Sequence, residues 1–192
     1  MAIYSLQREM SYPEALRKLC PSGPLSGLRN WINGPLRGAA EIYIPYRLYK
    51  VMVDDRGIKS ARYFAVDAAT GTLDPYEFDN PPDPHSRIEI DTRNFHPVRL
   101  NEEQTTKVVT EKVRRLLYSR GFFRLANPVI TAELMGPEFY IPYWAGFYGG
   151  EDNLSLIVLN AVRQTVEGNK VRRLVRTWLL ERGPQRELNP AF

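Results

Sequence analysis

The sequence of 192 residues holds one cysteine, Cys20, and two histidines. A lone thiol excludes a disulfide within the chain and a cluster of thiolate metal ligands. Its apolar runs fall far short of the roughly 20 residues that span a bilayer. The first ten residues, MAIYSLQREM, lack the basic cluster and apolar run of a secretory signal. These absences favour a soluble, cytoplasmic protein with no membrane partner, no metal and no cofactor.

Signatures of catalysis are also missing. The chain has no glycine-rich phosphate loop, no G-x-S-x-G and no pair of carboxylates in a catalytic pattern. His85 and His96 lie near Asp91 in a proline-rich stretch, but without the spacing of metal ligands. We therefore expect a protein that is not an enzyme. An enzyme with its site in the loop of residues 72–100, using these three side chains, is kept as an alternative.

Charge and composition are ordinary for a folded globular protein. The chain is 43% hydrophobic and 25% charged, and its 26 basic and 22 acidic residues give a net charge of +4. The charges are scattered along the chain rather than gathered in blocks. The basic balance is therefore only a slight indication of an anionic partner.

The most informative feature of the sequence is an internal repeat. Tyr-Ile-Pro-Tyr occurs at residues 43–46 and again at 140–143, each time two residues after a glutamate. Each copy continues into an aromatic run, a turn rich in glycine and acidic residues, and a second apolar run ending at Ala68 or Ala161. Two such runs joined by a turn are typical of a β-hairpin. Because a lone hairpin is marginal in water, we expect the two hairpins to share a sheet.

Three stretches with apolar residues on one face predict helices. One spans residues 101–120, one spans about 169–182, and a shorter one begins at the capping box of Ser11 and Glu14. Both longer helices contain Lys-Val-Arg-Arg-Leu, which favours a repeated strand–strand–helix unit. If the N-terminal helix is counted, the order becomes helix–strand–strand, twice, with a closing helix, and the sequence leaves both orders open.

The predicted fold class is α+β, an antiparallel sheet of duplicated β-hairpins covered by helices. The first unit would span residues 1–100, with the N-terminal helix and the proline-rich loop at 72–100. The second would span 101–192 and end in the C-terminal helix. Whether the two units form one compact domain is left open. Residues 87–91 are predicted to form a short edge strand.

Residues 63–73, YFAVDAATGTL, end a strand in Asp-x-x-Thr-Gly. The Asp and Thr side chains can bond amides of the turn, and glycine adopts positive φ at low cost. This segment resembles the strand and turn ending of PepSY-like domains, and the helix with antiparallel strands is similar to their cystatin-like architecture. The resemblance implies a duplicated cystatin-like topology. Such domains are mostly extracytoplasmic regulators of peptidases, and we carry over the topology only, because no export signal is visible.

The aromatic and proline residues of the repeat are the first candidate binding site. Proline within a strand is typical of an edge, a strand start or a bulge. The neighbouring rings could therefore line a groove for a partner protein, a peptide or a small ligand. The competing interpretation is that the rings pack the core and the prolines blunt an edge. The candidates are Tyr43, Pro45, Tyr46, Tyr140, Pro142, Tyr143 and Trp144.

The second candidate site consists of arginines on the two longer helices, namely Arg114, Arg115, Arg172 and Arg173. If these helices lie side by side, their basic faces could form one patch for phosphate groups. This is the nucleic-acid-binding alternative, and its competitor is a pair of merely solvated faces. A homodimer is also plausible, because an unpaired hairpin edge can extend a sheet into a second copy.

Overall fold

The computed structural model describes residues 1–20, 34–55, 57–119, 128–149 and 155–182, and confirms the α+β class. The strands are β1 (Ala2–Ser5), β2 (Leu36–Asp55), β3 (Ile58–Asp67), β4 (Tyr76–Phe78), β5 (Ile88–Asp91), β6 (Val129–Leu134), β7 (Phe139–Tyr148) and β8 (Ser155–Asn160). The helices are α1 (Tyr12–Leu19), α3 (Glu102–Ser119) and α4 (Asn169–Glu181), with a 3-10 turn η1 at Pro84–Ser86. None of the described helices is long and apolar enough to cross a membrane.

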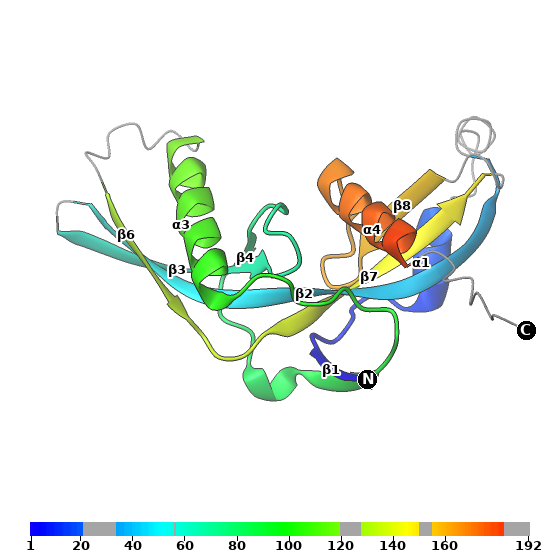
Figure 1. The fold of residues 1–192 in the computed structure, drawn as a ribbon, viewed down its shortest axis with the longest axis horizontal. Helices are drawn as coiled ribbons and strands as arrows, with labels where there is room; N and C mark the ends of the chain where they lie inside the picture. Colours follow the sequence, from blue (N-terminus) through cyan, green and yellow to red (C-terminus); the bar gives the residue numbers. More distant parts are fainter. Residues whose placement is uncertain (21–33, 56, 120–127, 150–154, 183–192) are drawn as a thin grey trace, which may run out of the picture.

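In the described part of the chain all eight strands belong to one sheet, with the central order β4-β3-β2-β7-β1-β5. β6 pairs with β2, and β8 pairs with β7 (Figure 1). The sheet is mixed rather than purely antiparallel, because β1 runs parallel to β7 where Ser5 meets Tyr140. β5 pairs antiparallel with β1 and is the last strand in this order.

Both predicted hairpins are present. β2 and β3 pair from Tyr46 opposite Asp67 outward, and β7 and β8 pair from Tyr143 opposite Asn160 outward. Most of the predicted turn at 149–153 lies outside the described residues. The proline-rich stretch at 72–100 is more regular than expected, because it contains β4, η1 and the predicted edge strand β5.

The two hairpins join through β2 and β7, which pair along the middle of the sheet. The two Tyr-Ile-Pro-Tyr copies lie opposite each other, with Ile44 paired to Ile141, Tyr43 to Pro142 and Pro45 to Tyr140. Exchanging the two copies leaves this set of pairs unchanged. The pair Ile44–Ile141 therefore marks a local two-fold axis perpendicular to the sheet, as antiparallel pairing of identical segments requires.

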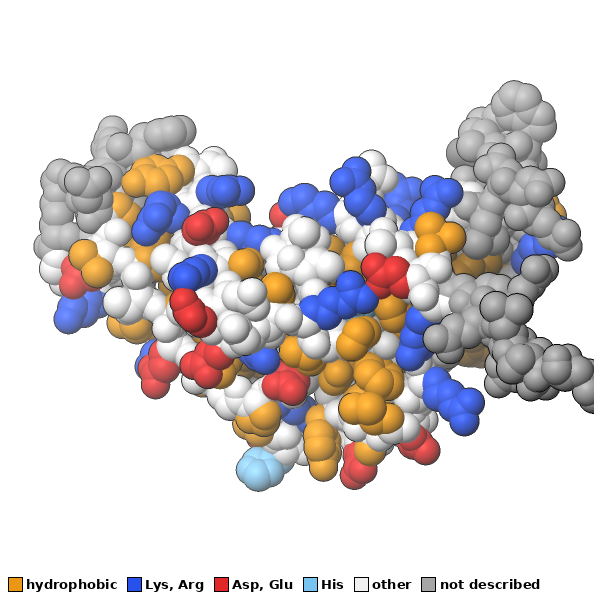
Figure 2. Space-filling view, in the orientation of Figure 1, with side chains coloured by type: hydrophobic (Ala, Val, Ile, Leu, Met, Phe, Trp, Pro, Cys, Tyr) orange, Lys and Arg blue, Asp and Glu red, His pale blue; other side chains and the backbone are white. Residues whose placement is uncertain are grey.

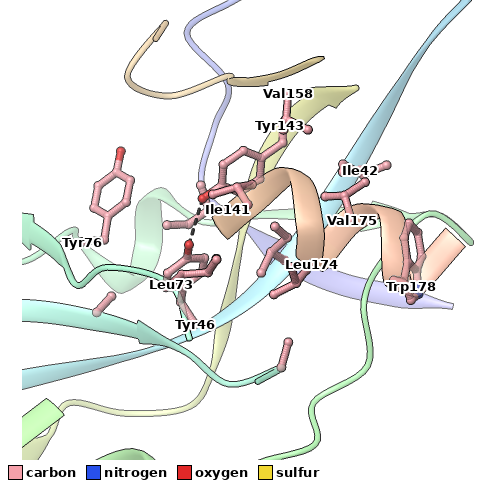
Figure 3. Close-up of a cluster of buried hydrophobic side chains, with 14 of the residues drawn as sticks. Ile42, Tyr46, Leu73, Tyr76, Ile141, Tyr143, Val158, Leu174, Val175 and Trp178 are labelled. Atoms are coloured by element: carbon pink, nitrogen blue, oxygen red, sulfur yellow. Dashed lines mark hydrogen bonds between the residues drawn. The ribbon is translucent and has the colours of Figure 1, made fainter. Parts of the chain in front are cut away.

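Side chains alternate between the two faces of these central strands. One face packs against α4 and contains Ile42, Tyr46, Ile141, Tyr143, Val158, Leu174, Val175 and Trp178 (Figure 3). On the other face, α3 packs on β2 and β3 through Tyr49, Val51, Phe64, Val109 and Val113. At the opposite end of that face, α1 packs on β7 and β8 through Leu19, Trp144, Tyr148 and Leu159.

The segments that lead into α1 and α3 dock on the sheet through matching backbone bonds. Leu6 N donates to Tyr140 O at 2.9 Å, and His96 N donates to Tyr43 O at 2.8 Å. The two acceptors are the first residues of the two Tyr-Ile-Pro-Tyr copies. Each helix therefore approaches its hairpin from the same position relative to the repeat.

The residues just before each helix are held in matching ways too. Met10 N donates to Ala161 O, and Leu100 N donates to Ala68 O, both at 3.0 Å. Both helices also begin with a capping box, at Ser11 in α1 and Asn101 in α3. α3 thus follows the same set of backbone bonds as α1, whereas α4 takes part in none of them.

Candidate functional site

The aromatic and proline candidates lie at the centre of the sheet. The prediction that Pro45 and Pro142 sit on hairpin edges is wrong, because β2 and β7 pair through both of them. Tyr43 N–H points away from β7, to Asn94 O at 2.9 Å. Pro45 lies two residues on, so its nitrogen faces the same side. It therefore removes no donor from the β2–β7 ladder.

All seven of these candidate side chains are buried. The Tyr46 and Tyr143 hydroxyls hydrogen-bond each other at 2.9 Å, across the local two-fold axis (Figure 3). Burial raises the pKa of both tyrosines, so that the pair stays neutral at ordinary pH. These residues pack the core, and they leave no exposed ring for a partner.

A hollow lies between α3 and α4 on the side of the molecule drawn in Figure 2. It consists of a cavity of about 500 Å³ against α4 and one of about 400 Å³ against α3. The two cavities share Thr72 and Lys170 in their walls, and the segment from Thr70 to Glu77 lies between the helices (Figure 1). We call the pair of cavities the α3–α4 trough.

The trough is basic. Its cationic side chains are Arg99, Lys112, Arg115, Lys170 and Arg173, and its carboxylates are Asp74, Glu77 and Glu181. Two of the cations are neutralised, since Lys170 pairs with Asp74 and Arg99 with Glu181, each at 2.5 Å. Lysine and arginine side chains gather on both flanks of the hollow (Figure 2). Arg115 and Arg173 have no ion-pair partner in the described part of the chain.

Lys112 is the most enclosed cation of the trough. Its Nζ donates to Leu73 O, and partial burial lowers its pKa. Asp67 and Asp74 oppose that shift, because their negative charges favour the protonated amine. Lys112 therefore joins α3 to the trough wall while it adds positive charge to the floor.

The wall between the helices is held rigid by one buried carboxylate. Asp67 accepts hydrogen bonds from Thr70 N at 2.7 Å and from Gly71 N and Leu73 N at 2.8 Å. Gly71 has a φ of +68°, a conformation that side chains with a Cβ disfavour. The Asp-x-x-Thr-Gly turn therefore has the bonding predicted from the sequence. It presents the Thr70 and Thr72 hydroxyls to the trough.

Two ring nitrogens lie in the wall at the α4 end. His96 is 3% exposed, and its Nδ1 lies 2.9 Å from Pro97 O. Because a carbonyl oxygen only accepts, Nδ1 carries the hydrogen and Nε2 is left as an acceptor. Burial lowers the pKa of His96, so the ring is neutral at pH 7. Trp178 lies beside it, with the two ring centroids 6.1 Å apart.

The arginine candidates divide into two groups. Arg115 and Arg173 line the trough, whereas Arg114 is exposed outside it and Arg172 donates to Asn169 Oδ1 at 2.6 Å. The sequence argument missed the lysines at the start of each Lys-Val-Arg-Arg-Leu. The signal was available, because the first and fourth positions of this motif share one helical face.

The third set of candidates does not form a site. His85 is exposed at η1, and Asp91 pairs with the amino group of Met1 at 2.6 Å, whereas His96 lies in the trough. Among the described residues, no group of three or more His, Cys, Asp or Glu side chains could hold a metal ion.

No family model, curated protein or solved structure matches this chain. The geometry of the trough is therefore the basis for a functional proposal.

Proposed function

We propose that this protein binds single-stranded nucleic acid in the α3–α4 trough, without catalysing a reaction. The observation that carries the proposal is the convergence of basic residues from two distant helices on one concave surface. These residues are Lys112 and Arg115 of α3 with Lys170 and Arg173 of α4. A groove of positive charge attracts a phosphate backbone irrespective of sequence.

The shape of the trough favours a single strand over a duplex. Proteins that read duplex DNA commonly place a protruding helix in its major groove. Here the cations line the space between two helices, where a flexible strand fits better. Single-stranded nucleic acid is usually held in such a basic groove. The cavities of about 500 and 400 Å³ each have room for a ligand of nucleotide size.

The proposal is tested by fluorescence anisotropy with a labelled 12-nucleotide single strand over a series of salt concentrations. The Arg115→Ala/Arg173→Ala double variant removes two trough cations for which the described residues supply no ion-pair partner. Its matched control is Arg114→Ala/Arg176→Ala, which removes two exposed arginines from the same helices outside the trough. The trough variant should bind at least tenfold more weakly.

The slope of log affinity against log salt should also fall by about 1.4 in the trough variant, at about 0.7 for each phosphate contact. The control should keep both its affinity and its slope. Equal losses in the two double variants would mean that scattered charge, rather than the trough, holds the strand. A salt-independent affinity would also refute the proposal.

The remaining expectations stay proposals. A partner protein or peptide would have to bind a surface other than the buried aromatic repeat. A pull-down with the trough variant tests this, because a partner bound elsewhere would be retained while nucleic acid would be lost. A homodimer is tested by the mass of the full chain in solution. A cytoplasmic location is tested by cell fractionation.

We also propose that the chain arose by duplication of a helix–strand–strand unit, in a cystatin-like, PepSY-like arrangement. The matching bonds at Tyr43 and Tyr140 and at Ala68 and Ala161 support it. Each unit's helix then covers the hairpin of the other unit. Fragments 1–91 and 92–192 should therefore fold together when mixed but not singly, as followed by circular dichroism. A fragment that folded alone would contradict the exchange of helices.

A further inference from the structure

We infer that the α4 end of the trough is a pocket for one nucleobase of the bound strand, with Trp178 and His96 as its hydrogen-bonding groups. The inference rests on the proposed function, because it needs a strand in the trough. The pocket is the cavity of about 500 Å³, and its wall contains both ring systems together with Lys170 and Arg173.

Trp178 supplies an unused donor. It is 4% exposed on the buried side of α4, and its Nε1 has no hydrogen-bond partner among the described residues. A buried N–H without an acceptor is costly and uncommon in folded proteins. The other described tryptophan, Trp144, is equally buried, yet its Nε1 donates to Met10 O at 3.0 Å. Burial in this fold therefore does not by itself leave a tryptophan donor unpaired, and of these two tryptophans it is Trp178 whose side chain lines the trough.

His96 supplies a matching acceptor. The bond between Nδ1 and Pro97 O leaves the Nε2 lone pair free, and the lowered pKa keeps that lone pair unprotonated at pH 7. The charged groups that act on the ring are Arg99, Glu181 and Asp67. Arg99 and Glu181 are already paired with each other at 2.5 Å. They therefore leave the imidazole available for a ligand.

A donor and an acceptor on neighbouring rings are complementary to the edge of a nucleobase, which carries both kinds of group in one plane. A phosphodiester or a sulfate group offers acceptors and negative charge but no donor for His96. The cations of the same cavity, Lys170 and Arg173, lie where they could hold the phosphate attached to that base. The hydroxyl of Thr177 in the same wall can act as a donor or as an acceptor.

The test compares a 12-nucleotide single strand with an abasic strand of equal length and charge. The wild-type protein should bind the strand with bases about fivefold or more tightly, the factor that one or two added hydrogen bonds provide. Trp178→Phe removes the donor but keeps an aromatic ring. It should reduce that preference to below twofold and leave the salt dependence unchanged. Trp144→Phe, the matched control, should keep the full preference.

The outcomes separate the two proposals. If both strands bind equally well to the wild-type protein with the same salt dependence, the base pocket is refuted and the trough proposal stands. If neither strand binds, both are refuted. A preference that survives in Trp178→Phe would also overturn the role of this donor. The comparison of the two strands on the wild-type protein is decisive even if a variant fails to fold.

Discussion

The hairpin β2–β3 with α3 and the hairpin β7–β8 with α1 use the same backbone contacts but different side chains to complete them. Arg47 Nη1 donates to Leu100 O at 2.6 Å, just before α3. At the matching place, Trp144 Nε1 donates to Met10 O at 3.0 Å, just before α1. One donor is charged and the other is part of a large apolar ring. In both places the acceptor is the carbonyl of the residue before the N-cap.

The turns that follow the hairpins differ in the same manner. Asp67 accepts three backbone N–H bonds at the end of β3, whereas Asn160 accepts two at the end of β8, from Val162 N at 3.0 Å and Arg163 N at 2.9 Å. The first turn leads into β4 and the trough wall, and the second leads directly into α4. A carboxylate accepts at more positions than an amide oxygen, so it can hold the longer turn.

The packing of the helices also differs. Gly146 lies beneath Leu19 of α1, and an added Cβ would come within 2.7 Å of the Leu19 Cδ2 atom. Tyr49, at the corresponding place in β2, fills the space under α3, and its hydroxyl lies 2.6 Å from Thr105 Oγ1. One interface is therefore close and apolar, and the other is wider with a polar contact. The same backbone contacts are therefore compatible with both kinds of helix–sheet interface.

The largest effect is expected at the two turns. Asp67→Ala should lower the free energy of unfolding by about 3 kcal/mol, because it leaves three N–H groups of the turn without their acceptor, that of the buried Leu73 among them. Asn160→Ala should cost about half as much. Urea unfolding of the two variants measures the difference. Equal losses would mean that the two turns are held equally, contrary to the bonding described above.

The close approach of α1 is tested by Gly146→Ala, which should cost about 2 kcal/mol because Leu19 has to move within a packed core. Gly38→Ala is the control, since its added Cβ would meet nothing within 4 Å. It should change stability little. If Gly146→Ala were equally neutral in thermal unfolding, α1 would not be packed as closely as described.

A smaller effect is expected at the two-fold axis. Tyr46→Phe and Tyr143→Phe should each cost about 1.5 kcal/mol, because each leaves the other hydroxyl buried without a partner. The double variant should cost clearly less than the two single losses combined. A double-mutant cycle in urea measures this coupling. Additive losses would show that the two hydroxyls do not depend on each other.

The smallest effect concerns pH. Burial lowers the pKa of His96 in the folded state, so below about pH 6.5 the unfolded chain binds more protons than the folded one. Stability should therefore fall as the pH is lowered from 7 to 5.5. His96→Gln should remove this part of the decline, as followed by melting temperature. A decline of the same size in the variant would assign it to other groups.

Much of the local structure was predictable because its signals are local. The capping boxes at Ser11 and Asn101, the Asp-x-x-Thr-Gly turn and both hairpins depend on residues within a few positions of one another. The edge position assigned to Pro45 was wrong for a long-range reason. Whether a strand has a neighbour depends on the far half of the chain, and here that neighbour is the second copy of the same motif.

The candidate site was predictable only in part. The repeated Lys-Val-Arg-Arg-Leu pointed to Arg115 and Arg173, but not to the pairing of Lys170 with Asp74 or to the place of His96 beside Trp178. Those contacts join residues 80 or more positions apart, and no periodicity in the chain reports them.

Hydrophobic alternation, caps and turn residues were enough to specify the helices, the hairpins and the class of fold, because each reflects the conformational preference of a short segment. Packing across the sheet determines which helix covers which hairpin. The same holds for the trough. Its cations lie close together only after α3 and α4 have packed on the folded sheet.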